Sequence, residues 1–376
     1  MRITPFLLDR WLTEHQFATP PIEFDLAAST GPRWTWGELL SQLAPGVLEG
    51  LGDVGVSYGP AAGSPALREA IAEMAGVAQA EVVAVTGASE ALLVVLLVAA
   101  EPGANVVLPH PGYPAFDELA RHLALDVRHY HLAASAQHTV DVDELATRLD
   151  DRTALVIVNT PHNPTGSVVG AELLAQLRDV VTSHGAQLVV DEVYHPVYHG
   201  PPTPSAATLA GATTIGDLSK ALCLAGLRTG WIVEHDRARF EQYVDARSYL
   251  TISNSPIDEA LAAAAIRSRG TIIARAQAVA EQNLATLDAF VAEHVELLGW
   301  VRPTGGLTAF PWLRSGADTR PFCIDAAAAG VLVAPGDCFG VPSHFRLGFG
   351  AAEHGFAEAV TRLGEVLTKH GQLRRL

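Results

Sequence analysis

The sequence predicts an α/β fold in which a mostly parallel sheet is covered by helices on both faces and is followed by a smaller α+β part. Between about residue 80 and residue 235, short β-branched and apolar runs alternate with segments of helical periodicity. Apolar strands that alternate with helices are typical of parallel sheets buried on both faces. Beyond residue 255 the alternation stops, and a long alanine-rich helical stretch precedes several short strands. We therefore expect a large α/β domain and a small α+β domain.

The elements expected in the large domain follow one another along the chain. Strands are predicted at residues 81–86, 105–109, 126–132, 153–159, 186–191, 213–216 and 229–234. Helices are predicted between them at residues 89–100, 115–123 and 171–184. In sheets of this kind the reactive residues gather at the carboxyl ends of the strands. The polar residues that follow these predicted ends include Ser89, Tyr113, Asn163, Asp191 and Lys220.

The small domain is predicted from the pattern of the last third of the chain. We expect one helical stretch over residues 256–293, short strands at 307–312, 331–334 and 345–349, and a last helix at 357–368. Residues 1–45 show no sheet pattern of their own and are expected to pack on the small domain. The predicted division is therefore an N-terminal segment of residues 1–45, a large domain of residues 46–274 and a small domain of residues 275–376.

The composition argues against several functional classes. A formal net charge of −16 disfavours binding to nucleic acid or to an anionic membrane. Cys223, Cys323 and Cys338 are widely spaced and include no CxxC pair, which fits a reducing compartment and gives no zinc site. The first ten residues lack a signal-peptide core because charges interrupt them, and the longest apolar stretch is too short to span a bilayer. We expect a cytoplasmic protein without a metal.

Lysine occurs only at Lys220 and Lys369, although the chain has 25 lysine and arginine residues together. Arginine cannot form an imine or lose its proton at working pH, whereas a partly buried lysine can do both. Lys369 lies in a charged stretch near the C-terminus and is expected at the surface. Lys220 lies between an apolar run and a glycine-containing turn, which suits Schiff-base chemistry, although an ordinary lysine at a helix start would have similar neighbours.

Three residues stand in an ordered spacing around this lysine. Asn163 lies in the turn of residues 160–166, Asp191 ends a later predicted strand, and Arg228 follows Lys220 in the next turn. Each is a weak signal alone, but together the chain resembles the class I/II aminotransferases, which are fold-type I enzymes that depend on pyridoxal 5′-phosphate (PLP). Further matches to the family's motifs extend the resemblance to nearly the whole length, in residues 58–68, 86–91, 111–114 and 345–348.

The resemblance implies roles for residues of the large, PLP-binding domain. Lys220 would bind PLP as a Schiff base and move the Cα proton of the substrate. Asp191 would pair with the pyridinium nitrogen, which keeps the ring an electron sink. Asn163 and Tyr194 would hydrogen-bond the phenolic oxygen of the ring, and Tyr113 would stack on the ring. Lys220, Asp191 and Tyr194 are thus the predicted catalytic residues.

The resemblance also implies a phosphate site and a carboxylate site. The phosphate is expected at the N-terminus of the predicted helix 89–100, where free N–H groups and the helix dipole favour an anion. The residues implied there are Gly87, Ala88, Ser89, Ser219 and Arg228, with Tyr58 reaching in from the partner subunit of a homodimer. Arg346, together with Asn163, would bind the substrate α-carboxylate, which a guanidinium can hold with two hydrogen bonds.

Asp217 departs from the family's pattern. Many relatives carry a serine three residues before the lysine, where it binds the phosphate, and this chain has Asp217 there. Since a carboxylate would repel a phosphate, we expect Asp217 to point elsewhere, toward Arg228 or toward a backbone amide.

The motifs leave two reactions open. The first expectation is an aminotransferase that acts on an α-amino acid and a 2-oxo acid. The alternative is a PLP-dependent lyase or cyclase of specialised metabolism, because residues 247–256 and 306–311 are similar to segments of capreomycidine synthases, which cyclise a hydroxyarginine. A guanidinium substrate would need carboxylates in the pocket, and none can be placed there from the sequence.

Two other polar groups fit these reactions less well. The histidines have no recognisable metal spacing and fit a surface or packing role; they are His110, His122, His129 and His131. Asp191 and Glu192 occupy adjacent strand positions, whose side chains point to opposite faces, so they cannot form a catalytic pair of carboxylates.

Overall fold

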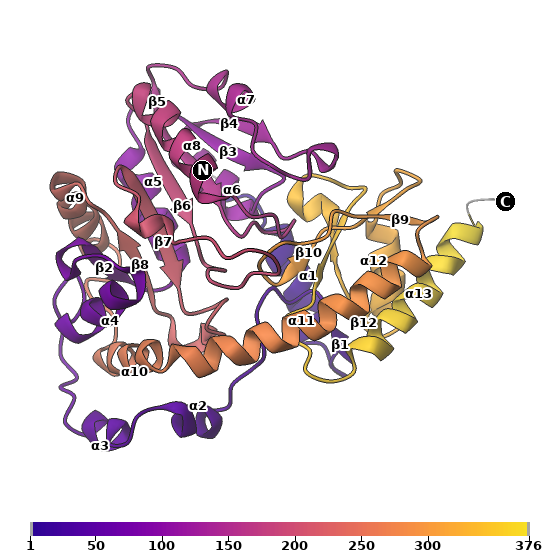
Figure 1. The fold of residues 1–376 in the computed structure, drawn as a ribbon, viewed down its shortest axis with the longest axis horizontal. Coiled ribbons are helices and arrows are strands. Elements are labelled where there is room, and N and C mark those ends of the chain that lie inside the picture. Colours follow the sequence, from indigo (N-terminus) through magenta and orange to yellow (C-terminus); the bar gives the residue numbers. More distant parts are fainter. Residues whose placement is uncertain (1–2, 374–376) are drawn as a thin grey trace.

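Seven strands form the central sheet in the order β2-β8-β7-β6-β5-β3-β4 (Figure 1). The computed structural model describes residues 3–373 of the chain. The strands are β2 Val82–Val85, β3 Asn105–His110, β4 Asp126–His131, β5 Thr153–Asn159, β6 Gln187–Asp191, β7 Ala212–Asp217 and β8 Gly230–Val233. The pairs from β4 through β7 are parallel, and β8 runs antiparallel to both of its neighbours. The predicted α/β class with a mostly parallel sheet is confirmed.

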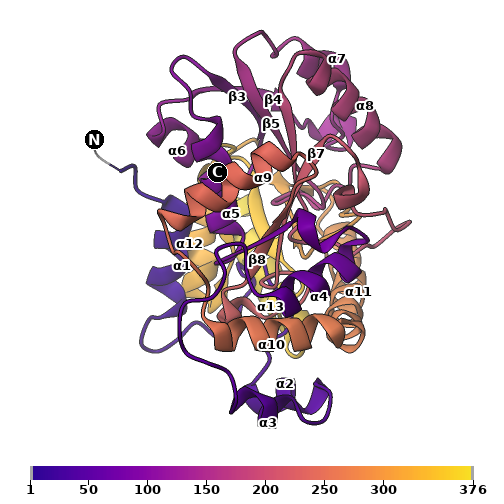
Figure 2. The ribbon, with the colours of Figure 1, turned by 90° about the vertical axis from the view of Figure 1, so that its left-hand side faces the viewer.

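Helices cover both faces of this sheet, which explains why its inner strands, such as β5 and β6, are rich in apolar residues (Figure 2). Leu155 and Ile157 of β5 face a core that includes residues of α5, α6 and α9. The alternate residues Val156 and Val158 face the opposite core, which includes residues of α7 and α8. The helices of this part are α4 Pro65–Ala75, α5 Ala88–Ala99, α6 Pro114–His122, α7 Val142–Ala146, α8 Ala171–Ser183, α9 Arg237–Ser248 and α10 Pro256–Arg267.

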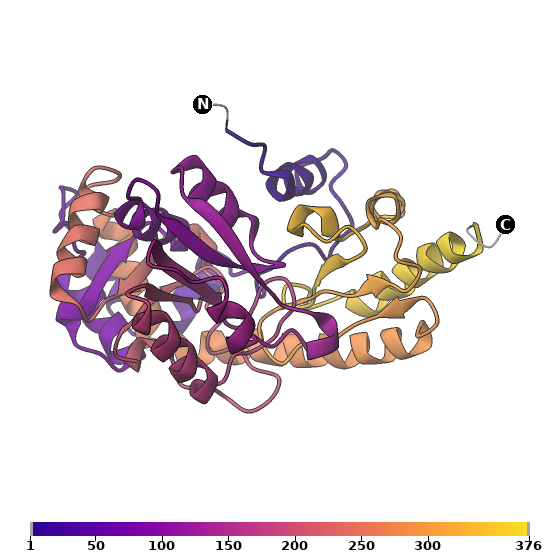
Figure 3. The same ribbon diagram turned by 90° about the horizontal axis from the view of Figure 1, so that it is seen from above.

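A small α+β domain follows, and the long helix α11 (Arg269–Glu293) reaches it from the sheet (Figures 1 and 3). Its other elements are β9 Leu298–Gly299, β10 Thr308–Ala309, β11 Trp312–Leu313, α12 Arg320–Ala328, β12 Val331–Leu332, β13 Ala334–Pro335, β14 Phe345–Gly348 and α13 Phe356–Leu373. The predicted boundary at residue 274 falls inside α11. We propose that this helix links the two domains.

Two predictions about the small domain are wrong in detail. Residues 307–312 and residues 331–334 each contain two short strands, and the two strands of each segment belong to different sheets. In the first segment Pro311, which has no N–H to donate, separates β10 from β11. The hydrophobic pattern shows that such a segment is buried and extended, but it does not show which strands pair.

The expected single helix over residues 256–293 is also wrong, because α10 and α11 are separate helices that meet at Ser268. Ser268 has φ −95° and ψ 11°, outside the helical geometry, and its N–H still bonds the carbonyl of Ala264 at 3.1 Å. Gly270, the residue in this stretch that most disfavours a helix, lies inside α11. Alanine-rich sequence on both sides gives no local signal for the break, which is set by where the two helices pack.

The N-terminal segment does contribute a strand, contrary to the prediction for residues 1–45. β1 (Phe24–Asp25) pairs in parallel with β12, and a strand of two residues is too short to show a period. Before it, α1 (Leu7–Gln16) lies against the small domain, where Trp11 Nε1 donates to the carbonyl of Val333 at 3.0 Å (Figure 3). The helices α2 (Trp36–Gln42) and α3 (Val47–Leu51) then protrude from the body of the molecule (Figures 1 and 2).

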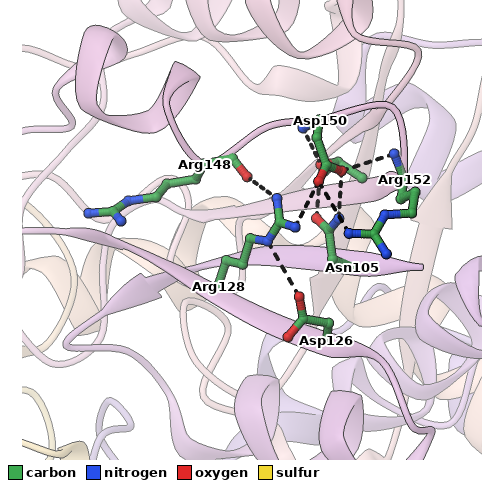
Figure 4. Close-up of polar contacts among 7 residues, drawn as sticks. Asn105, Asp126, Arg128, Arg148, Asp150 and Arg152 are labelled. Atoms are coloured by element: carbon green, nitrogen blue, oxygen red, sulfur yellow. Dashed lines mark hydrogen bonds and ion pairs between the residues drawn. The ribbon is translucent and has the colours of Figure 1, made fainter. Parts of the chain in front are cut away.

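A polar cluster ties three strands together at their amino ends (Figure 4). Asp150, just before β5, accepts hydrogen bonds from Arg128 Nη2 at 2.7 Å, Asn105 Nδ2 at 2.8 Å and the backbone N–H of Arg152 at 2.9 Å. Arg128 Nε also lies 3.4 Å from the Asp126 carboxylate. The Arg128 hydrogen bond is the main reason that the pKa of Asp150 is lowered. Because the cluster lies at the start of the strands, it leaves their carboxyl ends free for a site.

Within residues 3–373, no helix combines the length and the apolar character that crossing a membrane requires. Cys223, Cys323 and Cys338 are all unpaired thiols.

Candidate active site

A cavity of about 260 Å³, here called the site cavity, lies at the carboxyl ends of the strands beside the start of α5. Of the site residues predicted from the sequence, all but Gly87 and Tyr58 line it. Those that line it are Ala88, Ser89, Tyr113, Asn163, Asp191, Tyr194, Ser219, Lys220, Arg228 and Arg346. The fold therefore brings together residues that are far apart in the sequence.

Lys220 follows β7 and points into the site cavity, where its Nζ donates to Ser29 Oγ at 3.2 Å. Burial lowers the pKa of the Lys220 ammonium, a shift that the Asp217 carboxylate opposes and the Arg346 guanidinium reinforces. A lowered pKa increases the fraction of neutral amine, which is the form that attacks a carbonyl. Lys369, by contrast, is exposed on α13. Of the two lysines, Lys220 is the one placed for imine chemistry.

Asp191 ends β6 and is 8% exposed. Its Oδ1 accepts a hydrogen bond from the backbone N–H of Val193 at 3.1 Å. Burial raises the pKa of the Asp191 carboxyl to about 7, and the attraction of Lys220 offsets only a small part of this shift. A buried carboxylate gains most from a cation with a hydrogen to donate. The protonated nitrogen of a pyridine ring is such a group.

A pair of asparagines fixes the residues around Asp191. Asn159, which is paired with Asp191 across β5 and β6, donates its side-chain amide to the carbonyl of Asp191 at 3.0 Å. The side-chain oxygen of Asn159 accepts the backbone N–H of Asn163 at 2.7 Å. The sequence reasoning missed Asn159, although it ends a correctly predicted strand. It acts as a positioning residue for the turn that carries Asn163.

Arg346 on β14 is 1% exposed and reaches the cavity from the small domain. Its Nη1 donates to Asn163 Oδ1 at 3.2 Å and its Nη2 to the carbonyl of Ala27 at 2.8 Å, while its buried Nε has no hydrogen-bond partner among residues 3–373. Burial lowers the pKa of the guanidinium. A buried cation with an unused N–H is suited to bind a carboxylate.

Two tyrosines form further parts of the wall. Tyr194 donates its hydroxyl to the carbonyl of Ser29 at 3.2 Å, and burial raises its pKa to about 12, so that it stays a neutral donor. The ring of Tyr113 is held edge-on by Phe6 and Phe116, with centroids 5.9 and 5.7 Å away. This leaves Tyr113 fixed at the cavity wall, where the predicted stacking on a flat ring requires it.

At the start of α5 the backbone of Gly87 and the guanidinium of Arg228 lie close together. Gly87 has φ +79°, and a Cβ placed on it would lie 2.5 Å from Nη2 of Arg228. A guanidinium at a helix N-terminus meets the positive end of the helix dipole, so the two favour an anion between them. Gly230 is equally constrained, because its Cβ would lie 2.7 Å from the carbonyl carbon of Gly87.

Asp217 is the anion that lies at this helix start. Its carboxylate accepts from the backbone N–H groups of Ala88 at 3.3 Å and Ser219 at 2.9 Å, and from Ser219 Oγ at 2.6 and 2.7 Å. Of the two partners expected from the sequence, the backbone amide is therefore the one observed. Arg228 instead donates its Nη1 to the carbonyl of Ala225 at 3.0 Å.

The N-terminal segment closes one side of the cavity, a contribution that the sequence reasoning did not foresee. Ser29 bonds both Lys220 and Tyr194, and the lining also includes Phe6, Leu8, Asp9 and Leu12. These residues carry no motif, since their role depends on α1 packing across the cavity. Only the folded chain reveals them.

Tyr58 lies outside the site cavity and is 80% exposed. The neighbouring N–H of Gly59 donates to Ser253 Oγ at 3.3 Å, which places this loop beside residues 249–254. The single chain thus leaves Tyr58 free to reach another subunit.

The other polar groups take structural positions. Asp191 lines the site cavity, whereas Glu192 lines a separate cavity of about 110 Å³ and accepts the N–H of Ala206 at 2.7 Å, so the two carboxylates do face opposite ways. His129 Nε2 and the Asp117 carboxylate are hydrogen-bonded at 2.8 Å, and the tilted rings of His110 and His129 have centroids 5.6 Å apart. Among residues 3–373, no group of three His, Cys, Asp or Glu side chains is arranged to hold a metal ion.

The donor set of the site cavity fits PLP. It offers an amine with a lowered pKa, a buried carboxylate for a ring nitrogen and a helix N-terminus with a guanidinium for a phosphate. The unpartnered Nε of Arg346 remains for the carboxylate of an amino acid. Only the carboxylate of Asp217, which already occupies donors at the phosphate end, is out of keeping with this set.

The sequence matches the family Aminotransferase class I and II over residues 49–363. It is 32% identical to the capreomycidine synthase of Streptomyces vinaceus, over 98% of this chain and 95% of that protein. A solved PLP-dependent aminotransferase from Streptococcus suis aligns with a TM-score of 0.91 at 26% identity, covering 98% of this chain and 99% of that chain. The solved PLP-dependent cyclase OrfR aligns with a TM-score of 0.90 at 29% identity, covering 98% of each chain. With this match over most of its length, the chain belongs to the class I and II aminotransferase family and is a PLP-dependent enzyme of fold type I.

Proposed function

We propose that the protein is an aminotransferase that moves the amino group of an α-amino acid to a 2-oxo acid. The observation that carries this proposal is the convergence of Lys220, Asp191 and Arg346 on one cavity. These three groups meet the needs of an amino acid bound to PLP: a covalent anchor, a ring partner and a carboxylate partner. The three unpaired cysteines support a reducing, cytoplasmic compartment as part of the same proposal.

Each residue has a task that follows from its position. When bound, PLP supplies an aldehyde that condenses with amines and a ring that accepts the electron pair of the Cα–H bond. Lys220 would hold PLP through its amine, and the same amine, once free, would take a proton from the substrate Cα and return one. Arg346 would hold the α-carboxylate of the substrate in the cavity that Lys220 also lines. Asp191 would keep the ring nitrogen protonated, and Asn163 and Tyr194 would donate to the phenolic oxygen.

The test of this proposal follows the fate of the cofactor. Candidate amino acids are added one at a time to the holoenzyme without a 2-oxo acid, and the cofactor absorbance and the products are recorded. An aminotransferase converts one equivalent of cofactor to its amine form and releases one 2-oxo acid per site. Multiple turnovers that leave the aldehyde form unchanged would reject transamination and favour a lyase or cyclase.

A lyase or cyclase that acts on an arginine derivative is the second candidate. It is favoured by the likeness to the capreomycidine synthase and by Asp9, a carboxylate that the sequence could not place in the pocket. Asp9 is exposed in the first turn of α1, so it lies where the site cavity opens to solvent. Of the other two acids of the lining, Asp191 lies where the cofactor ring is expected and Asp217 lies where its phosphate is expected. Asp9 therefore remains for a cationic group at the far end of a substrate.

Asp9→Asn is expected to lower kcat/KM about two- to fivefold for substrates with a distal guanidinium or ammonium, the size of an exposed charge pair, and to leave neutral amino acids unaffected. The matched control is Glu14→Gln, an exposed acid on the same helix outside the cavity. An equal effect of Asp9→Asn on cationic and neutral substrates would assign Asp9 to the stability of α1, whose N-terminal dipole favours an acid.

We also propose that the protein acts as a homodimer with shared sites. Large apolar side chains are exposed on the adjoining loops around Gly59 and Ser253, at Val56, Tyr58, Tyr249, Leu250, Ile252 and Ile257. Monomeric proteins rarely expose such a patch, and a second copy of the chain is the partner that the family resemblance implies. Tyr58 lies within this patch, in position to serve the phosphate site of the other subunit.

Tyr58→Ala and Lys220→Ala are each expected to be poorly active alone and to complement each other when subunits exchange. In a mixed dimer with shared sites, one site carries both defects and the other carries neither. Random 1:1 mixing should then restore about a quarter of the sites, as closed two-fold pairing requires. If Tyr58 served its own subunit, both sites of every mixed dimer would stay defective and mixing would restore nothing.

A further inference from the structure

The start of α5 lacks a side-chain cap of its own. Its N-cap residue is Gly87, which has no side chain to accept the free N–H groups of the first turn. Asp217 performs part of this task from the end of β7, because its carboxylate accepts the N–H of Ala88, the first residue of α5, at 3.3 Å. The same carboxylate also accepts both donors of Ser219. Asp217 is 6% exposed, so its charge is held inside the protein against these donors.

The same donors are the ones that a cofactor phosphate needs. A phosphate at a helix N-terminus takes the backbone N–H groups of the first turn, here those beginning at Ala88. The Ser219 hydroxyl and the Arg228 guanidinium lie at the same end of the site cavity. Two anions cannot both use these donors without strong repulsion, because the distance between them would be only a few ångströms.

We propose that Asp217 is a built-in competitor of the cofactor phosphate. Its carboxylate occupies the phosphate donors when the phosphate is absent, and it must give up some of them when the phosphate binds. Asp217 thereby stabilises the cofactor-free chain and weakens its affinity for PLP, so that cofactor exchanges more readily than a neutral residue would allow. This inference rests on the proposed function only in taking this end of the cavity as the phosphate site.

A purely local role of Asp217 makes a different prediction. The bond from the Ser219 N–H to Asp217 Oδ1, at 2.9 Å, spans two residues and is the turn that aspartate and asparagine both form. If Asp217 only shaped the turn before Lys220, asparagine would leave affinity for the phosphate unchanged. If its charge matters, asparagine removes the repulsion and adds an N–H that can donate to the phosphate.

The test compares PLP with pyridoxal, which has the aldehyde and the ring but no phosphate. The full chain is freed of cofactor by dialysis, and the dissociation constants of both compounds are measured from cofactor absorbance for the wild type, Asp217→Asn and Asp217→Ser. We expect both variants to bind PLP at least about tenfold more tightly, from the loss of one buried like-charge contact, and to change their affinity for pyridoxal far less. Inorganic phosphate should compete with PLP more effectively in the variants.

The possible results of this binding comparison reject either the competition or the proposed function. Equal or weaker PLP binding in both variants, with pyridoxal unchanged, would overturn the competition. A parallel change for PLP and pyridoxal would show that Asp217 acts through the turn and Lys220, which also overturns it. Failure of the wild type to bind either compound would reject the proposed function, since the comparison among variants requires a site that binds the aldehyde. Thermal unfolding without cofactor gives an independent measurement, because both variants lose the negative charge at the positive end of α5 and should unfold at a lower temperature than the wild type.

Discussion

Lys220→Ala is expected to lower kcat by about four orders of magnitude or more, because it removes both the covalent anchor and the base that moves the Cα proton. The variant should still bind PLP through the phosphate and ring contacts, and it should lose the absorbance of the protein-bound imine. The chain offers a matched control in Lys369→Ala, since Lys369 is the other lysine and lies exposed on α13. That variant should keep wild-type turnover.

A second measurement on Lys220→Ala separates the loss of a catalytic amine from a defect in folding. A small primary amine in the buffer should restore part of the proton transfer in Lys220→Ala, because the vacated space at the end of β7 opens into the site cavity. The amine should have no effect on the wild type or on Lys369→Ala. Turnover of Lys220→Ala within tenfold of the wild type, without added amine, would remove Lys220 from the proposed chemistry.

Asp191→Asn is expected to weaken PLP binding about 30-fold or more, since breaking a buried charged pair costs about 2–5 kcal/mol, and to slow removal of the Cα proton. Without cofactor the same variant should be more stable than the wild type. The folded chain raises the pKa of this carboxyl from 3.8 to about 7 because of burial, so the folded state binds its proton more tightly than the unfolded state. Ionisation of the Asp191 carboxyl therefore destabilises the folded chain, and the free energy of unfolding falls as the pH rises from about 4 to about 7.

Thermal unfolding across this pH range tests the direction in which Asp191 changes the stability. The stability gained by cofactor-free Asp191→Asn should be largest above pH 7 and should vanish toward pH 4, whereas PLP should raise the unfolding temperature of the wild type more than that of the variant. Glu192→Gln is the matched control, because burial also raises the pKa of Glu192 to about 7 but its side chain faces away from the site cavity. It should leave PLP affinity unchanged. Equal PLP affinity in Asp191→Asn and the wild type would show that another group holds the ring nitrogen.

The sequence predicts the large domain well because its strands are buried on both faces. The run of residues 153–159 matches β5 at both ends, since helices pack on both sides and select apolar residues at positions 154–158. Where a strand has two residues, as in β1, or where a helix breaks at an ordinary serine, as at Ser268, no local pattern exists. These features depend on which distant segment packs nearby.

The same distinction separates the site residues that sequence reasoning finds from those that it misses. Lys220 and Asp191 lie at strand ends within recognisable motifs, so their meeting in one cavity could be expected. Ser29 and Asp9 come from the N-terminal segment, and only the packing of that segment across the cavity brings them to it. The sequence shows Asp217 as a departure from the family's pattern, but its hydrogen bonds to Ala88 and Ser219 are visible only in the folded chain.

The central claim is that PLP is bound covalently to Lys220, and borohydride reduction of the holoenzyme followed by peptide mapping tests it most directly. Reduction makes the bond between cofactor and lysine permanent, so that the modified residue can be identified by mass. With two lysines in the chain the result is unambiguous. The expected result is one cofactor per chain, attached to Lys220. Attachment to Lys369, or no attachment in a protein that has bound PLP, would contradict the account.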